Sequence, residues 1–230
     1  QAFKILELWG FKQAQKCFHL AYGFVSLPEG AMSARRGRVV LFKDVYDEAI
    51  QRVLATIAEK NPAMPESERQ GVAKKVGMGA MAYSMLAVDN NKDIIFDINE
   101  ALNFDGRTGP YIQNAYVRAN SILRKAGGDI RAADTRMFAY PLSNHEIALI
   151  EQLSHFPGVV QQAASEYRPL LVAAYVYDLA TAFHSFYHAV PVLQAEQETV
   201  KAARLRLVAA AKQVLANGLH LLGITAPEIM

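Results

Sequence analysis

The chain has 230 residues, of which 52% are hydrophobic and 20% charged, so it can bury a sizeable core and is not a disordered sequence. Its single cysteine excludes an internal disulfide and a cysteine-rich zinc site, and it fits a reducing, cytosolic setting. A net charge of +2 does not by itself argue for a nucleic-acid partner, and charged residues interrupt the long apolar stretches, so we expect no membrane span.

The first 43 residues carry short elements of mixed type. Residues 1–9 have the pattern of a helix end closed by Gly10, which we take to indicate that further residues precede this sequence in the full protein. Residues 18–25 are β-prone, residues 28–37 form a loop rich in glycine and basic residues, and residues 38–42 can extend as a strand. We expect this segment to be the remnant of an α/β domain.

From residue 44 onward the pattern is helical. Asp44 is expected to cap the first helix, Pro110 to occupy the first position of a later one, and Ser143 with Glu146 to form a capping box. Prolines are expected to separate the helices after the capping box, at Pro157 and Pro169. The apolar spacing predicts helices at 44–59, 68–86, 110–126, from 143 onward, at 170–188 and at 196–222.

The predicted architecture is therefore mainly α, with at least five helices in a bundle and any β-structure confined to about the first 45 residues. The helix at 68–86 carries several small residues, which allow a neighbouring helix to approach closely: Gly77, Gly79, Ala80 and Ala82.

Three stretches, in the same order along the chain, carry a resemblance to a known family. They are PEGAMSARRG at 28–37, FDINEALNFDGRTGPYIQNAYVRANSILRKAG at 96–127 and AARLRLVAAAKQVLANGLHLLGITAPEIM at 202–230. Together they resemble the C-terminal part of class I arginyl-tRNA synthetases, over essentially the whole chain. The resemblance implies a short remnant of the Rossmann-type catalytic domain at 1–43, connecting helices at 44–104, and a helix-bundle anticodon-binding domain at 105–230.

The resemblance also implies a function and a set of partners. The chain is expected to bind the anticodon region of tRNA(Arg), so that the catalytic domain can attach arginine with ATP and Mg²⁺. No catalytic residue is implied for this chain, which is expected to be inactive alone. The full protein is expected to be a cytoplasmic monomer that binds neither membranes nor DNA.

The loop at 28–37 is similar to the family's lysine-methionine-serine signature loop, in which a cation stabilises negative charge on the ATP phosphates. Its candidate residues are Ala31, Met32, Ser33, Arg35 and Arg36. Ala31 stands where the family has its lysine. Either an arginine of the loop or a lysine elsewhere supplies that charge, or the protein is a non-catalytic homologue with a regulatory, scaffold or tRNA-binding role. An ordinary basic surface loop is the plainest alternative.

The helix after Pro110 places four candidate residues on one face by their spacing: Tyr111, Asn114, Ala115 and Arg118. The resemblance implies that this face meets anticodon bases, together with Tyr187 and Met230. Unpaired bases stack on aromatic rings or a guanidinium plane and are read by hydrogen bonds to their edges. The alternative for this face is a half-buried Tyr111 with Arg118 facing solvent. For the bundle as a whole, the remaining alternative is an unrelated helical interaction module.

A histidine pair, His184 and His188, has the helical spacing of two zinc ligands. A glutamate does not follow the first histidine, where Ser185 stands, and no third ligand is evident. We therefore predict no metal site.

Overall fold

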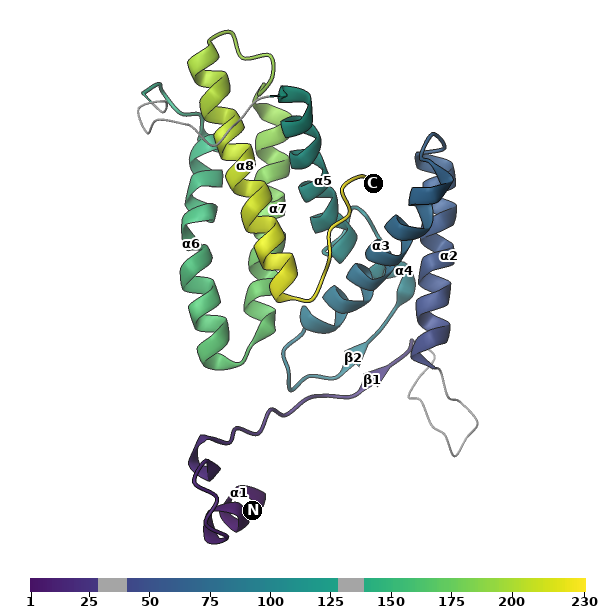
Figure 1. Ribbon diagram of the computed structural model, residues 1–230, viewed down its shortest axis with the longest axis vertical. Coiled ribbons are helices and arrows are strands. Elements are labelled where there is room, and N and C mark those ends of the chain that lie inside the picture. The colour runs from purple at the N-terminus through teal and green to yellow at the C-terminus, as the bar shows by residue number, and fades with distance from the viewer. Residues whose placement is uncertain (29–40, 128–138) are drawn as a thin grey trace.

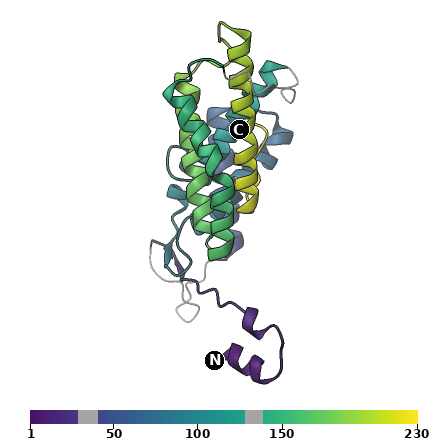
Figure 2. The ribbon, with the colours of Figure 1, turned by 90° about the vertical axis from the view of Figure 1, so that its left-hand side faces the viewer.

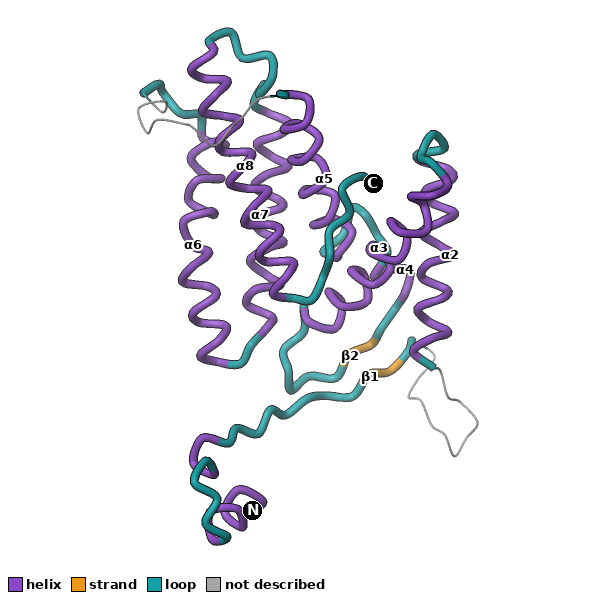
Figure 3. Tube along the Cα trace, viewed as in Figure 1, coloured by secondary structure: helices purple, strands orange, loops and turns teal. Residues whose placement is uncertain are grey.

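The computed structural model describes residues 1–28, 41–127 and 139–230. Helices dominate this part of the chain, and the strands there form a single two-stranded sheet (Figure 3). In chain order the elements are α1 (Ala2–Leu8), the 3₁₀ helix η1 (Ala14–Lys16), β1 (Val25–Ser26), α2 (Phe42–Lys60), α3 (Glu66–Leu86), β2 (Ile94–Ile95), α4 (Ile98–Ala101), α5 (Gly109–Ala126), α6 (Asn144–Glu166), α7 (Pro169–Ala189) and α8 (Glu198–Leu221).

Helices α5, α6, α7 and α8 pack into a bundle, and α6, α7 and α8 run along one another (Figures 1 and 2). Helix α7 supplies much of the core because Val176, Leu179, Phe183 and Phe186 recur at helical spacing and are fully buried. Burying a large apolar side chain stabilises the folded state by about 1.5–3 kcal/mol. The predicted mainly α bundle is confirmed.

Helices α2 and α3 form a second, smaller unit that leans on the bundle through the contact between α3 and α5 (Figure 1). At this crossing a Cβ on Gly109 would lie 2.3 Å from the carbonyl oxygen of Gly79. Only residues without a side chain allow such an approach. The close approach expected from the small residues of α3 is therefore confirmed, and it places the start of α5 against α3.

The expected confinement of β-structure to the first 45 residues was wrong. Strand β2 pairs in parallel with β1, with Val25 opposite Ile94 and Ser26 opposite Ile95. The sheet forms between segments about seventy residues apart, so local spacing along either segment did not reveal it. Of the predicted β-prone stretch at 18–25, only Val25 lies in a strand.

Three residues that were expected to mark helix ends occupy other positions. Helix α2 begins at Phe42 with Leu41 as its N-cap, so Asp44 lies in the first turn, where a carboxylate favours the helix dipole. Helix α5 starts one residue before Pro110 and is capped by Thr108. Pro157 lies inside α6 and does not end it, because the helix packs on the bundle core on both sides of the proline.

The capping box predicted at Ser143 and Glu146 is confirmed. Glu146 is fully buried and also accepts hydrogen bonds from Tyr140, at 2.7 Å, and from the Arg204 Nε on α8, at 3.0 Å. Burial alone raises the pKa of this carboxyl, but the hydrogen bonds from Tyr140, Ser143 and Arg204 outweigh it and lower the pKa to about 2. In the described residues, no helix is both long and apolar enough to cross a membrane.

Candidate functional site

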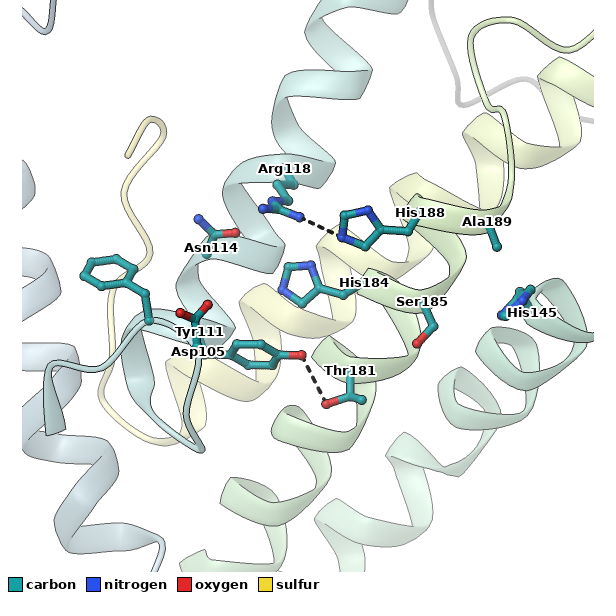
Figure 4. A pocket seen from close by; sticks show the side chains of 11 residues that line it. Asp105, Tyr111, Asn114, Arg118, His145, Thr181, His184, Ser185, His188 and Ala189 are labelled. Atoms are coloured by element: carbon teal, nitrogen blue, oxygen red, sulfur yellow. Dashed lines mark hydrogen bonds between the residues drawn. The ribbon is translucent and has the colours of Figure 1, made fainter. Parts of the chain in front are cut away.

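A cleft of about 740 Å³ opens between α5 and α7, and we call it the α5–α7 cleft (Figure 4). Helices α5 and α7 supply most of its lining, and the loop before α5 and the start of α6 supply the rest. The lining residues are Phe104, Asp105, Tyr111, Asn114, Arg118, His145, Thr181, His184, Ser185, His188 and Ala189.

Local sequence explains how α5 faces this cleft. The Thr108 hydroxyl accepts a hydrogen bond from the Tyr111 backbone amide at 3.3 Å, which starts the helix immediately before the cleft residues. The helical period then brings Tyr111, Asn114 and Arg118 to the same face, as predicted. Ala115 is fully buried in the bundle core and does not line the cleft, so its placement among the ligand-contacting residues was wrong.

Tyr111 contacts three side chains of α7. Its hydroxyl lies 3.4 Å from the Thr181 hydroxyl, and its ring centroid lies 4.8 Å from that of His184 and 5.4 Å from that of Tyr177 (Figure 4). The ring is half-buried against the core, as in the alternative of a half-buried Tyr111. It lines the cleft while it packs on the core.

Arg118 is not a residue that merely points into solvent. Its Nη1 lies 3.4 Å from Nε2 of His188, and its Cζ lies 5.3 Å from the ring centroid of Tyr187 (Figure 4). Tyr187 is 40% exposed and lines an adjoining depression of about 430 Å³ that Arg118 and His188 also line. Arg118 therefore stands between two recesses, one lined by Tyr111 and the other by Tyr187.

His184 also lines the cleft, and its Nδ1 is buried without a hydrogen-bond partner among the described residues. Burial, together with the nearby charge of Arg118, lowers the pKa of His184 to about 4, so the imidazole is neutral at pH 7. The described residues contain no group of three or more His, Cys, Asp or Glu side chains placed to hold a metal ion.

Asp105 and Asn114 present unused polar groups to the cleft. Neither side chain makes a hydrogen bond or ion pair to another residue in the described ranges. Asn114 was among the predicted contacts, but Asp105, Thr181, His184 and His188 were not assigned to the site. The i, i+3, i+4, i+7 spacing of Thr181, His184, Ser185 and His188 was the available signal on α7, because it is the same one-face pattern that identified α5.

Met230 lies next to the α5–α7 cleft and not inside it. It packs on an apolar cluster of α2 and α3 and lines a third cavity, of about 340 Å³. This cavity shares Phe104, Asp105 and Asn114 with the cleft, so these residues form a wall between the two spaces. The predicted signature-loop residues Ala31, Met32, Ser33, Arg35 and Arg36 lie outside the described residues.

Comparison with known proteins adds a family to this geometry. The model of the DALR anticodon binding domain matches residues 112–230, more than half of the chain. The chain belongs to the family of DALR anticodon binding domains. The DALR match begins within α5 and covers the rest of the bundle. The model of the catalytic domain of class I (R) tRNA synthetases matches residues 1–98.

Relatives match the chain along its whole length or nearly so. The arginine–tRNA ligase of Clostridium beijerinckii is 40% identical over the full chain, and that of Pyrococcus abyssi is 44% identical over 98% of it. The solved arginyl-tRNA synthetase of Thermus thermophilus superposes with a TM-score of 0.89 at 39% identity, over 99% of this chain and 38% of that one. The chain spans about 40% of the length of the curated relative from Clostridium beijerinckii.

Proposed function

We propose that the α5–α7 cleft binds unpaired bases of the anticodon loop of tRNA(Arg). The observation that supports this most directly is the arrangement around Arg118, a guanidinium held over the Tyr187 ring between two recesses. Aromatic rings and guanidinium planes are the surfaces on which splayed-out RNA bases stack. The DALR match over the same helices supports the choice of an anticodon over any other single-stranded RNA.

The polar groups of the cleft suit the reading of base edges. The Asp105 carboxylate accepts hydrogen bonds only, and the Asn114 carboxamide both donates and accepts. Because neither group has a partner among the described residues, a base edge can use both without breaking an existing contact. His184, neutral at pH 7, lines the same cleft.

We propose that the full protein is an arginine–tRNA ligase that attaches arginine to tRNA(Arg) with ATP and Mg²⁺. The support is the identity of the relatives along the whole chain and the catalytic-domain match at its start. The signature loop with Ala31, Met32, Ser33, Arg35 and Arg36 is proposed to approach the ATP phosphates. The proposed domain boundaries are 1–43, 44–104 and 105–230, with Tyr111, Asn114, Arg118 and Tyr187 as the anticodon-binding residues and Met230 close by.

We further propose a cytoplasmic monomer that binds neither DNA nor membranes, a setting that the single cysteine of the sequence suits. The alternative of a non-catalytic regulatory or tRNA-binding homologue rested on Ala31 in the signature loop. The relatives that cover the whole chain carry the name of ligases, so they support the ligase.

Aminoacylation by the full-length protein tests the proposed activity. With arginine, ATP, Mg²⁺ and total tRNA, we expect arginine to be esterified to tRNA and no other amino acid to be charged. This chain by itself is expected to show no arginine-dependent exchange between ATP and pyrophosphate. A full-length protein that binds tRNA(Arg) but never charges it would favour the non-catalytic homologue.

A further inference from the structure

The last residues of the chain, 224–230, form an extended segment that we call the tail. The chain turns sharply after α8 at Gly223, whose φ is +69°, and the Ile224 amide bonds back to the Leu219 carbonyl at 2.9 Å. The tail then runs along α5 toward α3 and α2 (Figure 1). The tail forms no helix or strand of its own, so beyond this turn its position depends on side-chain contacts from the neighbouring helices.

Glu228 anchors the tail on α5. The Asn120 amide Nδ2 donates to the Glu228 carboxylate at 2.8 Å and to its backbone carbonyl at 3.0 Å, and the Tyr116 hydroxyl donates to the other carboxylate oxygen at 3.2 Å. Lys212 of α8 donates to Asn120 Oδ1 at 2.7 Å and lies over the Tyr116 ring. The lysine orients the asparagine amide toward Glu228.

Gln113 provides a second attachment, nearer the start of the tail. It is fully buried, and its Nε2 donates to the Thr225 carbonyl at 2.9 Å and to the Lys75 carbonyl of α3 at 3.0 Å. One buried amide thus links the tail, α5 and α3. Both N–H groups of this amide are thereby paired, whereas the Gln113 Oε1 is buried without a partner among the described residues.

The anchored tail ends behind the wall of the α5–α7 cleft. Ile229 and Met230 pack on the apolar cluster of α2 and α3, and Met230 lines the cavity on the far side of Phe104, Asp105 and Asn114. Helix α5 therefore has one face that lines the cleft and another that binds the tail. Tyr111, Asn114 and Arg118 face the cleft, whereas Gln113, Tyr116 and Asn120 hold the tail.

We propose that Glu228 is a positioning residue for anticodon recognition. By fastening the tail to Asn120 and Tyr116, it keeps Met230 against the shared wall and so fixes the Asn114 and Asp105 edges that face a bound base. This inference rests on the proposed function, because it concerns how the same cleft is kept in shape. Glu228 itself lines neither the cleft nor the adjoining depression, so its effect is transmitted through the tail.

The test exchanges the two groups of the anchor in the full-length protein. Glu228→Gln leaves an amide facing the Asn120 amide, and Asn120→Asp leaves two carboxylates facing each other. The double variant restores an amide–carboxylate pair, with Lys212 now beside the new aspartate. We expect each single change to weaken binding of tRNA(Arg) on the order of five- to ten-fold, as for loss of one ordinary hydrogen bond, and the double variant to recover most of that loss.

Discrimination between anticodons is the measurement that a merely structural role of Glu228 would leave unchanged. We expect the single variants to reduce the ratio of affinities between tRNA(Arg) and the same tRNA with a substituted anticodon, and the double variant to restore it. Val159→Ala, on α6 away from the tail, is the matched control, because it trims the edge of the bundle core without touching the anchor. It should lower the melting temperature and leave the ratio unchanged.

Two results would overturn the inference. Affinity and discrimination in both single variants within two-fold of the unsubstituted protein would show that the anchor does not shape the cleft. A loss that the double variant does not recover would show that general destabilisation is responsible. If the unsubstituted protein fails to bind tRNA(Arg) at all, the proposed function fails first and the inference falls with it.

Discussion

Replacing Tyr187 by alanine is the most direct test of the proposed anticodon surface. The ring is 40% exposed and lies 5.3 Å from the Arg118 guanidinium carbon, so its removal eliminates one stacking surface and frees Arg118 on that side. Loss of a base–aromatic stack costs about 1–3 kcal/mol. This corresponds to a fall in affinity of roughly five- to 150-fold. Tyr187→Phe keeps the ring and should cost much less.

The stability cost of the same change should be small. The side chain is partly exposed, and a cation–π contact at an exposed site contributes about 0.5–1 kcal/mol. For a protein of at least this size, a loss of 1 kcal/mol lowers the melting temperature by roughly 2–4 °C. The expected pattern is therefore a large change in affinity with a small change in stability.

Filter binding or fluorescence titration of full-length protein with tRNA(Arg) measures the affinity, and thermal melts of each variant measure the stability. Tyr167→Ala is the matched control, since Tyr167 is 51% exposed and stacks on Phe18 at the turn between α6 and α7, outside the cleft lining. It should leave the affinity unchanged. If Tyr187→Ala retains full affinity while its melting temperature falls by several degrees, Tyr187 is a packing residue and the reasoning is refuted.

Three further predictions follow from other contacts. Arg118→Ala should weaken tRNA binding and, if its charge also neutralises a tRNA phosphate, reduce the slope of log affinity against log salt by about one; unchanged affinity would remove Arg118 from the proposed surface. Gly109→Ala should destabilise the fold by about 1–3 kcal/mol, because its Cβ would lie 2.3 Å from a backbone oxygen. Gly158→Ala, with no atom beyond its own helical turn within 4 Å of the new Cβ, should be neutral or stabilising, and urea unfolding of the two variants measures the difference. The Glu146 carboxylate, with a pKa of about 2 against an ordinary 4.5, should stabilise the folded state by about 3 kcal/mol above pH 4.5 and lose that contribution as the pH falls toward 2. Glu146→Gln should lower stability at pH 7 and flatten this acid limb, and parallel acid limbs in the two proteins would contradict the assignment.

Much of the helical architecture could be read from local sequence. The capping box at Ser143 and Glu146, the glycine after α8 and the apolar spacing of α7 each act over one or two turns, so their signals lie within a few residues. Pro157 misled the prediction for the same reason. A local rule ends a helix at proline, but packing of both halves of α6 on the bundle outweighs the lost hydrogen bond.

The candidate site, too, could be predicted from local sequence only in part. Helical spacing alone was sufficient to place Tyr111, Asn114 and Arg118 on one face, because a helix repeats regularly whatever surrounds it. Spacing could not tell that Ala115, next to them, is fully buried, since the boundary between an exposed and a buried stripe depends on where α7 and α8 pack.

What the sequence by itself determined is therefore the set of helices, the cleft-facing stripe of α5 and the family resemblance that points to an anticodon. Only the tertiary structure decided which other residues share the cleft and which residues stand behind it. His184 and His188 of α7 meet Arg118 across about seventy residues of chain, and Glu228 meets Asn120 across 108 residues. Such pairings follow from packing of distant elements, whose free energy depends on surfaces that neither segment contains alone.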